Sequence, residues 1–475
     1  MWKYNVSKEE LTYSNDYSKF LKEKEEKRVD SGFDVKDSEL NPNLFDWQRA
    51  IVKWCLKKGK CALFEDTGMG KTIQQLAWAD AIVKHTKGKV LILAPLAVSK
   101  QTAKEGDKFG IKVNIIEKEE DIKEGINITN YEKLHKFDVS QFVGVCLDES
   151  SILKSYSGKT TMELIDLFRY TPYKLSCSAT PSPNDYTELG NQAEFLNVMT
   201  MNEMLAMYFI NDASHGNGWR LKGHSEFEFY KWITEWAILI NNPSNLGYDG
   251  TMYNLPKLNI NKVILKSETW DTETLFAIPA ETLGERREAR KSSIPEKIET
   301  IKELVKGMNN CLIWCDYNYE SEELKKAIPE GYEIKGSDSP EYKENGMTGF
   351  SNGEVKILIS KPSICGFGMN WQNCNNMIFC GLSDSYEQFY QAIRRCWRFG
   401  QNKEVNVYVI ISDKETNMLE NIKKKEIQHQ RMSKNMIDIM SAMTIAELNN
   451  TTIKDKRYLP TIKMEIPSFI YEKIN

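Results

Sequence analysis

The sequence predicts an α/β protein with two parallel-sheet lobes in tandem and a helical tail. Three observations support this prediction. The chain has 475 residues, more than the roughly 150 that one domain usually needs. Short apolar runs alternate with amphipathic segments in two separate stretches, which is typical of strands joined by crossover helices. An aromatic-rich segment and a charged helical segment separate these two stretches.

We expect six regions along the chain. In order, they are an N-terminal polar arm, a first lobe, a helical insertion rich in aromatic residues, a linker helix, a second lobe, and a C-terminal helix with a tail. Their bounds are 1–40, 41–198, 199–265, 266–306, 307–413 and 414–475. The arm is polar and carries charges of both signs, so a solvated face without function is its simplest interpretation.

Apolar runs mark the expected strands of both lobes. In the first lobe they cover residues 61–64, 90–95, 113–116, 126–129, 143–147 and 174–177. In the second lobe they cover residues 311–315, 355–359, 377–379 and 405–411. The spacing between runs leaves room for helices, which favours parallel sheets.

The insertion is rich in large aromatic residues, among them Tyr208, Phe209, Trp219, Phe227, Phe229, Tyr230, Trp232 and Trp236. Over residues 226–240 the large apolar side chains have helical spacing. A helix packed into the core is the simpler interpretation, and a nucleic-acid contact is the alternative.

Composition excludes several classes of protein. Lys+Arg number 63 and Asp+Glu 67, so a nucleic-acid partner must be bound by a local basic surface. The ten cysteines include no CxxC pair and the five histidines no HExxH motif, so we expect reduced core cysteines and no zinc site. The longest strongly apolar run, residues 90–98, is shorter than the roughly 20 residues that span a bilayer, and we expect a cytoplasmic protein.

A glycine loop follows the first predicted strand. It reads Glu65-Asp66-Thr67-Gly68-Met69-Gly70-Lys71-Thr72 and leads directly into a helical run. This order of elements is typical of a phosphate-binding loop, or P-loop, in which Lys71 reaches the β- and γ-phosphates and the Thr72 hydroxyl can bind Mg²⁺. Glu65 stands where the motif GxxxxGK[ST] has its first glycine. A tight strand-to-helix turn without a ligand is the alternative.

An acidic pair, Asp148 and Glu149, follows the apolar run 143–147. The carboxyl ends of parallel strands share one edge of a sheet, so these side chains should emerge beside the P-loop. Hydrolysis needs a carboxylate for the metal and another to activate water. We therefore assign Asp148 to Mg²⁺ and Glu149 to the general base. A helix cap is the alternative.

With these residues in place, the sequence resembles the superfamily 2 helicases, and most closely the SNF2-like double-stranded DNA translocases in their compact phage and bacterial form. The likeness spans roughly residues 44–412. Residues 44–48 resemble the element upstream of the P-loop whose glutamine, here Gln48, binds adenine. Residues 66–72 are similar to the DEMGLGKT of the family, which also has an acidic residue where other P-loops have glycine.

Other motifs of this family follow in order. Residues 94–98 resemble motif Ia, 128–132 motif Ib, 178–181 motif III and 366–371 motif V. Residues 148–151 read DESS where the family has DEAH or DEGH, so the usual histidine is absent. Residues 391–401, QAIRRCWRFGQ, resemble motif VI, QAxxRxxRxGQ, and form the most specific string in the chain.

The resemblance implies two RecA-like lobes and an ATP- and Mg²⁺-dependent motor that moves along DNA, with duplex DNA favoured. It implies catalytic roles for Glu149, Gln391, Arg395 and Arg398. It assigns ATP contacts to Gln48, Thr67, Gly68, Met69, Gly70, Lys71 and Thr72, and Mg²⁺ contacts to Thr72 and Asp148. On a helix, Arg395 and Arg398 would share a face and could point together across a cleft at the γ-phosphate.

Two alternatives remain open at this point. One is a strand-separating DNA or RNA helicase, although motif VI ends in Gly-Gln, which argues mildly against RNA. The other is an ATP-gated nucleic-acid-binding module without significant turnover. A basic cluster of Lys423, Lys424, Lys425, Arg431 and Lys434 could bind phosphates or form a solvated helix face.

Overall fold

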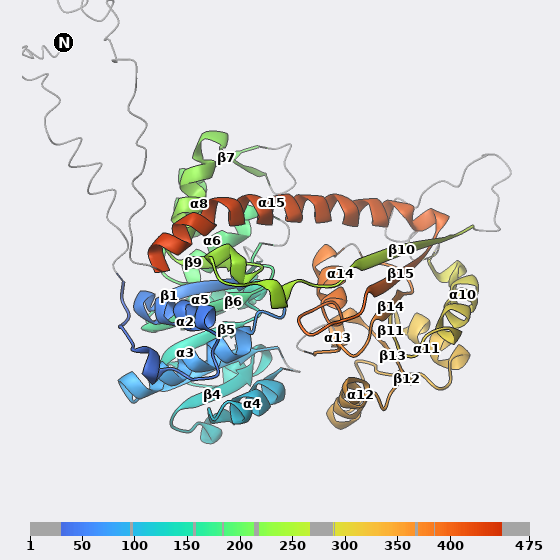
Figure 1. Cartoon of the computed structure of the whole chain (residues 1–475), viewed down its shortest axis with the longest axis horizontal. Helices are drawn as coiled ribbons and strands as arrows, with labels where there is room; N and C mark the ends of the chain where they lie inside the picture. Colours follow the sequence, from blue (N-terminus) through green and yellow to red (C-terminus); the bar gives the residue numbers. More distant parts are fainter. Residues whose placement is uncertain are drawn as a thin grey trace, which may run out of the picture.

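The computed structural model describes residues 30–95, 98–154, 158–182, 185–212, 218–266, 288, 290–365, 369–383 and 385–448. Figure 1 shows two α/β lobes beside one another, with one long helix across both. Most of the predicted N-terminal arm and the tail beyond residue 448 lie outside the described residues. The predicted fold class, two parallel-sheet lobes in tandem, is confirmed.

Among the described residues, the first lobe forms a seven-stranded sheet in the order β3-β4-β2-β5-β6-β1-β9. Each neighbouring pair in it is parallel. The strands are β1 Lys60–Glu65, β2 Lys89–Ala94, β3 Val113–Ile115, β4 Ile126–Asn130, β5 Phe142–Asp148, β6 Tyr173–Ser178 and β9 Ala237–Ile240. All six strands that we predicted here are present, with small shifts at their ends.

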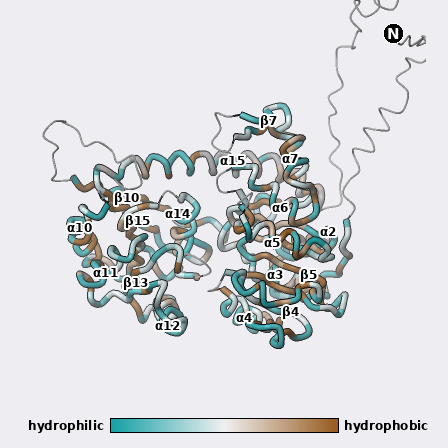
Figure 2. Tube along the Cα trace, turned by 180° about the vertical axis from the view of Figure 1, so that it is seen from behind, coloured by the Kyte–Doolittle hydropathy of each residue, from teal (hydrophilic) through white to brown (hydrophobic). Residues whose placement is uncertain are grey.

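Helices cover both faces of this sheet. They are α2 Asp46–Lys58, α3 Lys71–Thr86, α4 Ser99–Lys108, α5 Lys159–Leu167, α6 Leu189–Phe195, α7 Met201–Tyr208 and α8 Glu226–Thr234. In β1, Cys61 and Leu63 pack into one hydrophobic core, and Ala62 and Phe64 pack into the other. A strand buried on both faces is apolar throughout, which explains the continuous apolar runs in the sequence. Figure 2 shows such hydrophobic segments inside the lobes.

The second lobe contains a six-stranded parallel sheet in the order β10-β15-β14-β11-β13-β12, within the part of the chain that is described. Its strands are β10 Leu258–Leu265, β11 Cys311–Trp314, β12 Tyr332–Glu333, β13 Ile357–Ser360, β14 Asn376–Phe379 and β15 Val405–Ser412. Its helices are α10 Ile294–Lys306, α11 Asn318–Ala327, α12 Pro340–Asn352, α13 Pro362–Cys365 and α14 Tyr386–Ile393.

The predicted helical insertion, residues 199–265, is only partly helical. Strand β9 from this range pairs with β1, and β10 pairs with β15, so the range supplies an edge strand to each sheet. It also forms a hairpin of β7 Phe209–Asn211 and β8 Trp219–Leu221. The helix predicted over 226–240 ends at Thr234. The four apolar residues of β9 are buried beside β1, which pairs with the backbone groups on one side of this edge strand.

The aromatic residues of this range pack into the first lobe, as the simpler interpretation predicted. Six of them are buried members of its core: Tyr208, Phe209, Phe229, Tyr230, Trp232 and Trp236. Trp219 packs against the same core from a partly buried position. Phe227 is the exception among these eight side chains, because 46% of it is exposed.

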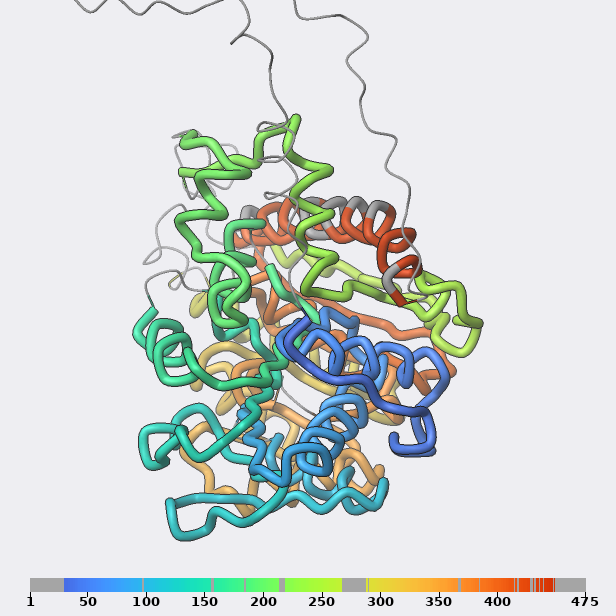
Figure 3. Tube along the Cα trace, turned by 90° about the vertical axis from the view of Figure 1, so that its left-hand side faces the viewer, coloured from blue at the N-terminus to red at the C-terminus, as the bar shows by residue number. Residues whose placement is uncertain are grey.

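Helix α15, Thr416–Leu448, joins the two lobes, and Figures 1 and 3 show it running above the sheet of the first lobe. Near its start, Ile422 belongs to the core of the second lobe. Further along, Met436, Ile437 and Met440 belong to a core of the first lobe. The predicted C-terminal helix is therefore present, and it packs on both lobes.

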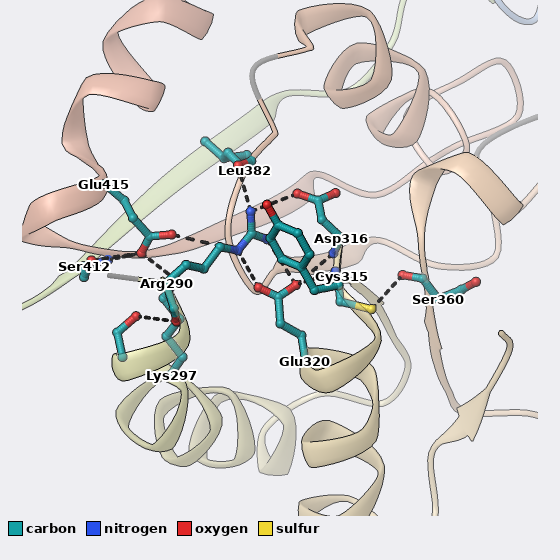
Figure 4. Close-up of polar contacts among 11 residues, drawn as sticks. Arg290, Lys297, Cys315, Asp316, Glu320, Ser360, Leu382, Ser412 and Glu415 are labelled. Atoms are coloured by element: carbon teal, nitrogen blue, oxygen red, sulfur yellow. Dashed lines mark hydrogen bonds and ion pairs between the residues drawn. The ribbon is translucent and has the colours of Figure 1, made fainter. Parts of the chain in front are cut away.

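A cluster of buried ion pairs lies around the start of α10 in the second lobe (Figure 4). Arg290 forms ion pairs with Glu320 at the start of α11 and with Asp316 after β11, the latter at 3.0 Å. Its guanidinium also donates to the carbonyl oxygen of Leu382 at 2.9 Å. Lys297 of α10 pairs with Glu415, just before α15, at 2.6 Å. This cluster therefore ties α10, α11, α15 and the loop before α14 together.

The ten cysteines are free and buried, as we expected of reduced core thiols. Within the described residues, no group of three or more His, Cys, Asp or Glu side chains is arranged to hold a metal ion. The described helices include none that is both long and apolar enough to cross a membrane.

Candidate nucleotide site between the lobes

The predicted P-loop lies between β1 and α3. Gly68 and Gly70 have φ angles of +92° and +82°, a region that favours glycine, and Gly70 is the residue before α3 begins. Lys71, the first residue of α3, donates its Nζ to the carbonyl oxygens of Glu65 at 2.7 Å and Asp66 at 3.2 Å. The loop, the lysine and the helix N-terminus thus have the arrangement that binds phosphates.

Glu65 replaces the first glycine of the motif and is fully buried. Its Oε2 accepts a hydrogen bond from Gln74 Nε2 at 2.8 Å. Burial raises the pKa of Glu65 to about 7, although Lys71 and the Gln74 amide act in the opposite direction. Glu65 therefore contributes to the site as a buried carboxyl that is easily protonated.

Gln48 of α2 lies directly against the P-loop. Its Nε2 donates to the carbonyl oxygen of Met69 at 2.9 Å, and its Oε1 accepts from the backbone N–H of Phe45 at 3.1 Å. A Cβ at Gly70 would lie 2.4 Å from Gln48 Nε2, so glycine is needed for this close approach. The side chain predicted to bind adenine is thus held in place by the loop itself.

The acidic pair lies at the carboxyl end of β5, as predicted. Asp148 Oδ1 accepts a hydrogen bond at 2.9 Å from Gln75 Nε2 on α3, which places this carboxylate beside the helix that follows the P-loop. Glu149 has φ of +57°, an uncommon conformation for a residue with a side chain. Such strain is often retained where a side chain has to be aimed at a reaction.

The carboxyl of Glu149 is suited to accept a proton. Its Oε2 is buried and has no hydrogen-bond partner among the described residues. Burial raises the pKa of Glu149 to about 7, Asp148 adds to this effect, and Lys71 and Arg395 oppose it. A base with a pKa near the working pH is favourable for proton transfer.

Side chains from other parts of the first lobe form hydrogen bonds with the backbone around the acidic pair. Tyr131 donates its hydroxyl to the carbonyl oxygen of Asp148 at 2.7 Å. Behind the acidic pair, Gln192 Nε2 donates to the carbonyl oxygen of Ser150 at 2.7 Å. Leu96 and Ala97 of the predicted motif Ia lie outside the described residues.

The motif VI arginines follow α14. This helix ends at Ile393, so Arg395 and Arg398 lie in turns rather than on the helix that we predicted. The carbonyl oxygen of Arg395 accepts from the N–H of Trp371 at 2.9 Å and does not continue the helical ladder. Gln391 is on the last turn of α14, where its Nε2 contacts Glu387 Oε1 at 3.4 Å.

Arg395 and Arg398 nevertheless point to the same place. Both donate to the carbonyl oxygen of Met369, at 3.4 and 3.3 Å. Burial lowers the pKa of Arg398 to about 9, and the neighbouring arginines add to this effect. Within the described part of the chain, neither arginine forms an ion pair with a carboxylate. The site therefore has positive charge, buried at Arg395 and partly buried at Arg398, that an anionic group would balance.

Motif V is only partly described. Met369 and Asn370 are described, and Gly366, Phe367 and Gly368 lie outside the described residues. The carbonyl oxygen of Met369 thus provides the contact between motif V and the arginines of motif VI.

The second lobe contacts the P-loop directly. Arg394 pairs with Asp66 at 2.7 Å and donates to the carbonyl oxygen of Thr67 at 2.8 Å. A Cβ at Gly68 would lie 3.0 Å from the backbone nitrogen of Phe399. Arg394 could not be identified as a site residue from the sequence, because motif VI allows any residue at that position and its partner lies in the other lobe.

The residues assigned to Mg²⁺ and ATP fit these groups in their chemistry. Thr72 and Asp148 offer oxygen ligands, and Mg²⁺ is commonly bound by one or two protein oxygens together with substrate phosphates. When bound, Mg²⁺ neutralises charge on phosphate oxygens. Among the described residues, Oε2 of Glu149 has no hydrogen-bond partner, and Arg395 and Arg398 form no ion pair with a carboxylate. A bound triphosphate and its attacking water would use these side chains.

The predicted basic cluster is on α15. Lys423, Lys424 and Lys434 are exposed, and Lys425 is partly buried. The side chain of Arg431 lies outside the described ones. Both interpretations of this cluster stay open.

Two parallel-sheet lobes that meet at a P-loop, an acidic pair and buried arginines define a class, the two-lobed P-loop proteins of the helicase type. Residues 47–212 match the SNF2-related domain, and residues 296–400 match the helicase conserved C-terminal domain. These matches cover more than half of the chain. The chain belongs to the SNF2-like group of superfamily 2 helicases.

Two known proteins are similar to this chain. The chain is 22% identical over 429 residues to protein p41 of Acyrthosiphon pisum secondary endosymbiont phage 1, a match that covers 77% of this chain and 92% of the relative. Among solved structures it is similar to the Sulfolobus solfataricus SWI2/SNF2 ATPase core in complex with dsDNA. That match has 17% identity and a TM-score of 0.42, and covers 88% of this chain and 99% of the other.

Proposed function

We propose that the protein is a nucleic-acid-dependent ATPase that couples ATP hydrolysis to movement along duplex DNA. The observation that carries this proposal is the convergence of both lobes on one P-loop. Arg394 of the second lobe pairs with Asp66 of this loop at 2.7 Å. Lys71 of the loop and Arg395 of the second lobe both lower the pKa of Glu149. Groups that sit on separate lobes thus share one electrostatic site.

The proposed chemistry assigns a role to each side chain. Lys71 and the backbone N–H groups of the P-loop bind the phosphates. Glu149 accepts the proton of the water that attacks the γ-phosphate. Arg395 and Arg398 balance the negative charge of the transition state, an effect typically worth about 10³ to 10⁵ in rate. Thr72 and Asp148 hold Mg²⁺ in this proposal, and Gln48 contacts the adenine.

Movement would follow from the position of the site. Contacts with the triphosphate come from both lobes in this proposal, so bound ATP favours the closed arrangement and hydrolysis removes that preference. A duplex held by both lobes would then be stepped along. DNA is the proposed partner because the SNF2-like family assignment favours it, and a phage or bacterial cytoplasm is the proposed location.

The experiment is a comparison of ATP turnover without nucleic acid and with duplex DNA, single-stranded DNA or RNA, at one fixed salt concentration. We expect the largest stimulation with duplex DNA and loss of turnover in Lys71→Ala and Glu149→Gln. A larger stimulation by single strands or RNA would support the strand-separating alternative. Tight ATP binding with negligible turnover on every nucleic acid would support the ATP-gated binding module.

A further inference from the structure

Arg394 lies next to Arg395 in the chain but faces a different partner. Its guanidinium pairs with Asp66 Oδ2 at 2.7 Å and donates to the carbonyl oxygen of Thr67 at 2.8 Å. Arg395 instead donates to the carbonyl oxygen of Met369 at 3.4 Å. Neighbouring arginines are thus divided between the P-loop and the proposed phosphate site.

The contact between Arg394 and Asp66 is largely shielded from water. Only 4% of the Arg394 side chain and 21% of the Asp66 side chain are exposed. Asp66 Oδ1 also accepts a hydrogen bond from the Tyr390 hydroxyl at 2.9 Å and from the backbone N–H of Thr67 at 2.6 Å. Both oxygens of this carboxylate are therefore used, and each receives a donor from the second lobe.

Two aromatic rings hold the Arg394 side chain. Its guanidinium carbon lies 5.8 Å from the ring centroid of Tyr390 and 5.1 Å from that of Trp397. Trp397 in turn donates its Nε1 to the carbonyl oxygen of Pro256 at 2.7 Å, just before β10. Arg394 thus has one packed position, which is a property expected of a side chain that sets geometry.

We propose that Arg394 is a positioning residue that fixes the second lobe on the P-loop through Asp66 and thereby places Arg395 and Arg398 beside the acidic pair. The link uses side chains of this chain alone, so it holds the lobes together before any nucleotide binds. Its effect on turnover rests on the proposed ATPase function, whereas its effect on the lobes does not.

A second inter-lobe ion pair offers a matched control. Lys100 of α4 pairs with Glu344 of α12 at 2.7 Å, and 65% and 38% of these side chains are exposed. Exposed ion pairs of this kind contribute little to the stability of a protein. The Glu344→Gln substitution therefore removes an inter-lobe ion pair that is remote from the P-loop contacts of Arg394.

The test uses the full chain with Arg394→Met, Asp66→Asn, the double variant and Glu344→Gln. Without nucleotide, amide hydrogen exchange over residues 65–72 should be about tenfold faster or more in Arg394→Met and unchanged in Glu344→Gln. Small-angle scattering should show a larger radius of gyration for Arg394→Met and an unchanged one for Glu344→Gln. Unchanged exchange and unchanged dimensions in Arg394→Met would overturn the inference.

Turnover provides the second readout. In Arg394→Met we expect kcat to fall about 10- to 100-fold, because a misplaced catalytic group costs about this much, while the Kd of ATP changes less than about threefold. The double variant should be no worse than Arg394→Met, because the two side chains act as a pair. If the decreases in kcat of Arg394→Met and Asp66→Asn multiply in the double variant, the inference would be overturned.

The positioning role can be tested even if Arg394→Met does not fold or the proposed ATPase function fails. If Arg394→Met does not fold, Arg394→Lys replaces it, since it retains the charge but loses the two-point contact with Asp66 and Thr67. If the unsubstituted chain shows no turnover with any nucleic acid, the proposed ATPase function fails. The exchange and scattering data then decide the positioning role on their own.

Discussion

Gln48 and Met69 are joined by a hydrogen bond of 2.9 Å from the side-chain amide of the first to the carbonyl oxygen of the second. This bond fastens α2 to the P-loop, and the opposite end of the same amide accepts from Phe45 N–H. The conformation of the loop therefore depends on a side chain that precedes it by a strand and most of a helix.

Replacing Gln48 by Leu should weaken nucleotide binding by about tenfold, because the buried carbonyl of Met69 loses its donor at a cost of about 1–3 kcal/mol. Titration with a fluorescent ATP analogue measures this change. Lys53→Ala on the same helix is the control, since 42% of the Lys53 side chain is exposed and it pairs only with Asp37 among the ion pairs of the described residues. Equal affinities for Gln48→Leu and the control would contradict the proposed contact.

The turnover rate should depend on pH through Glu149. Its pKa is raised to about 7 by burial, and only the deprotonated carboxylate accepts a proton. The rate should therefore rise with pH and reach half of its maximum near pH 7. Glu149→Gln should lower the rate by about 10² to 10⁴ and remove this dependence. Glu163→Gln, at an exposed position of α5 outside the motifs, should keep both rate and profile.

Ionisation of the buried Glu65 carboxyl should lower the free energy of unfolding of the protein as pH rises. Its folded-state pKa of about 7 lies above the ordinary value of 4.5, so the folded protein binds the proton more tightly than the unfolded chain does. Stability that is present below pH 4.5 is then lost as pH rises to about 7. Glu65→Gln should be more stable than the unsubstituted chain by up to about 3 kcal/mol at pH 8 and close to equal at pH 4. Urea unfolding at both pH values measures this, and equal stability at pH 8 would show that Glu65 ionises freely.

Arg290→Met should destabilise the second lobe by about 3–5 kcal/mol, because it leaves Asp316 and Glu320 without their cation in a buried site. Urea is the suitable denaturant, since it does not screen ion pairs. Lys302→Met provides the control, because 44% of the Lys302 side chain is exposed. A loss of stability no larger than that of Lys302→Met would mean that the Arg290 ion cluster does not stabilise the second lobe.

Gly381 supplies an independent test of the same cluster. It has φ of +135°, and a Cβ there would lie 2.5 Å from the Arg290 guanidinium. Gly381→Ala should therefore be destabilising in the unsubstituted chain but less so when Arg290 is already Met. Additive losses would show that the glycine is needed for its backbone conformation alone.

The strands of both sheets could largely be predicted from sequence because most of them are continuous apolar runs between turn residues. Strand β9 could not, because its four residues follow a helix and continue the helical spacing of large side chains. What makes it a strand is the free edge of β1, which lies far away in the sequence. The end of α14 was missed for a similar reason, since Trp371 binds the carbonyl oxygen of Arg395.

The candidate site divides in the same way. The P-loop and the acidic pair are local patterns, and their proximity follows from the common edge of a parallel sheet. The roles of Asp66 and Arg394 depend on how one lobe meets the other, which no local spacing encodes.

In the proposed function, both lobes contribute to one triphosphate pocket. Its most direct test is single-turnover ATP hydrolysis by Arg398→Ala at saturating duplex DNA, with the Kd of ATP measured in parallel. We expect a rate about 10³ to 10⁵ lower than that of the unsubstituted chain, with ATP affinity nearly unchanged. A rate within a factor of about three of the unsubstituted chain would contradict the role of Arg398 from the second lobe at the reacting phosphate.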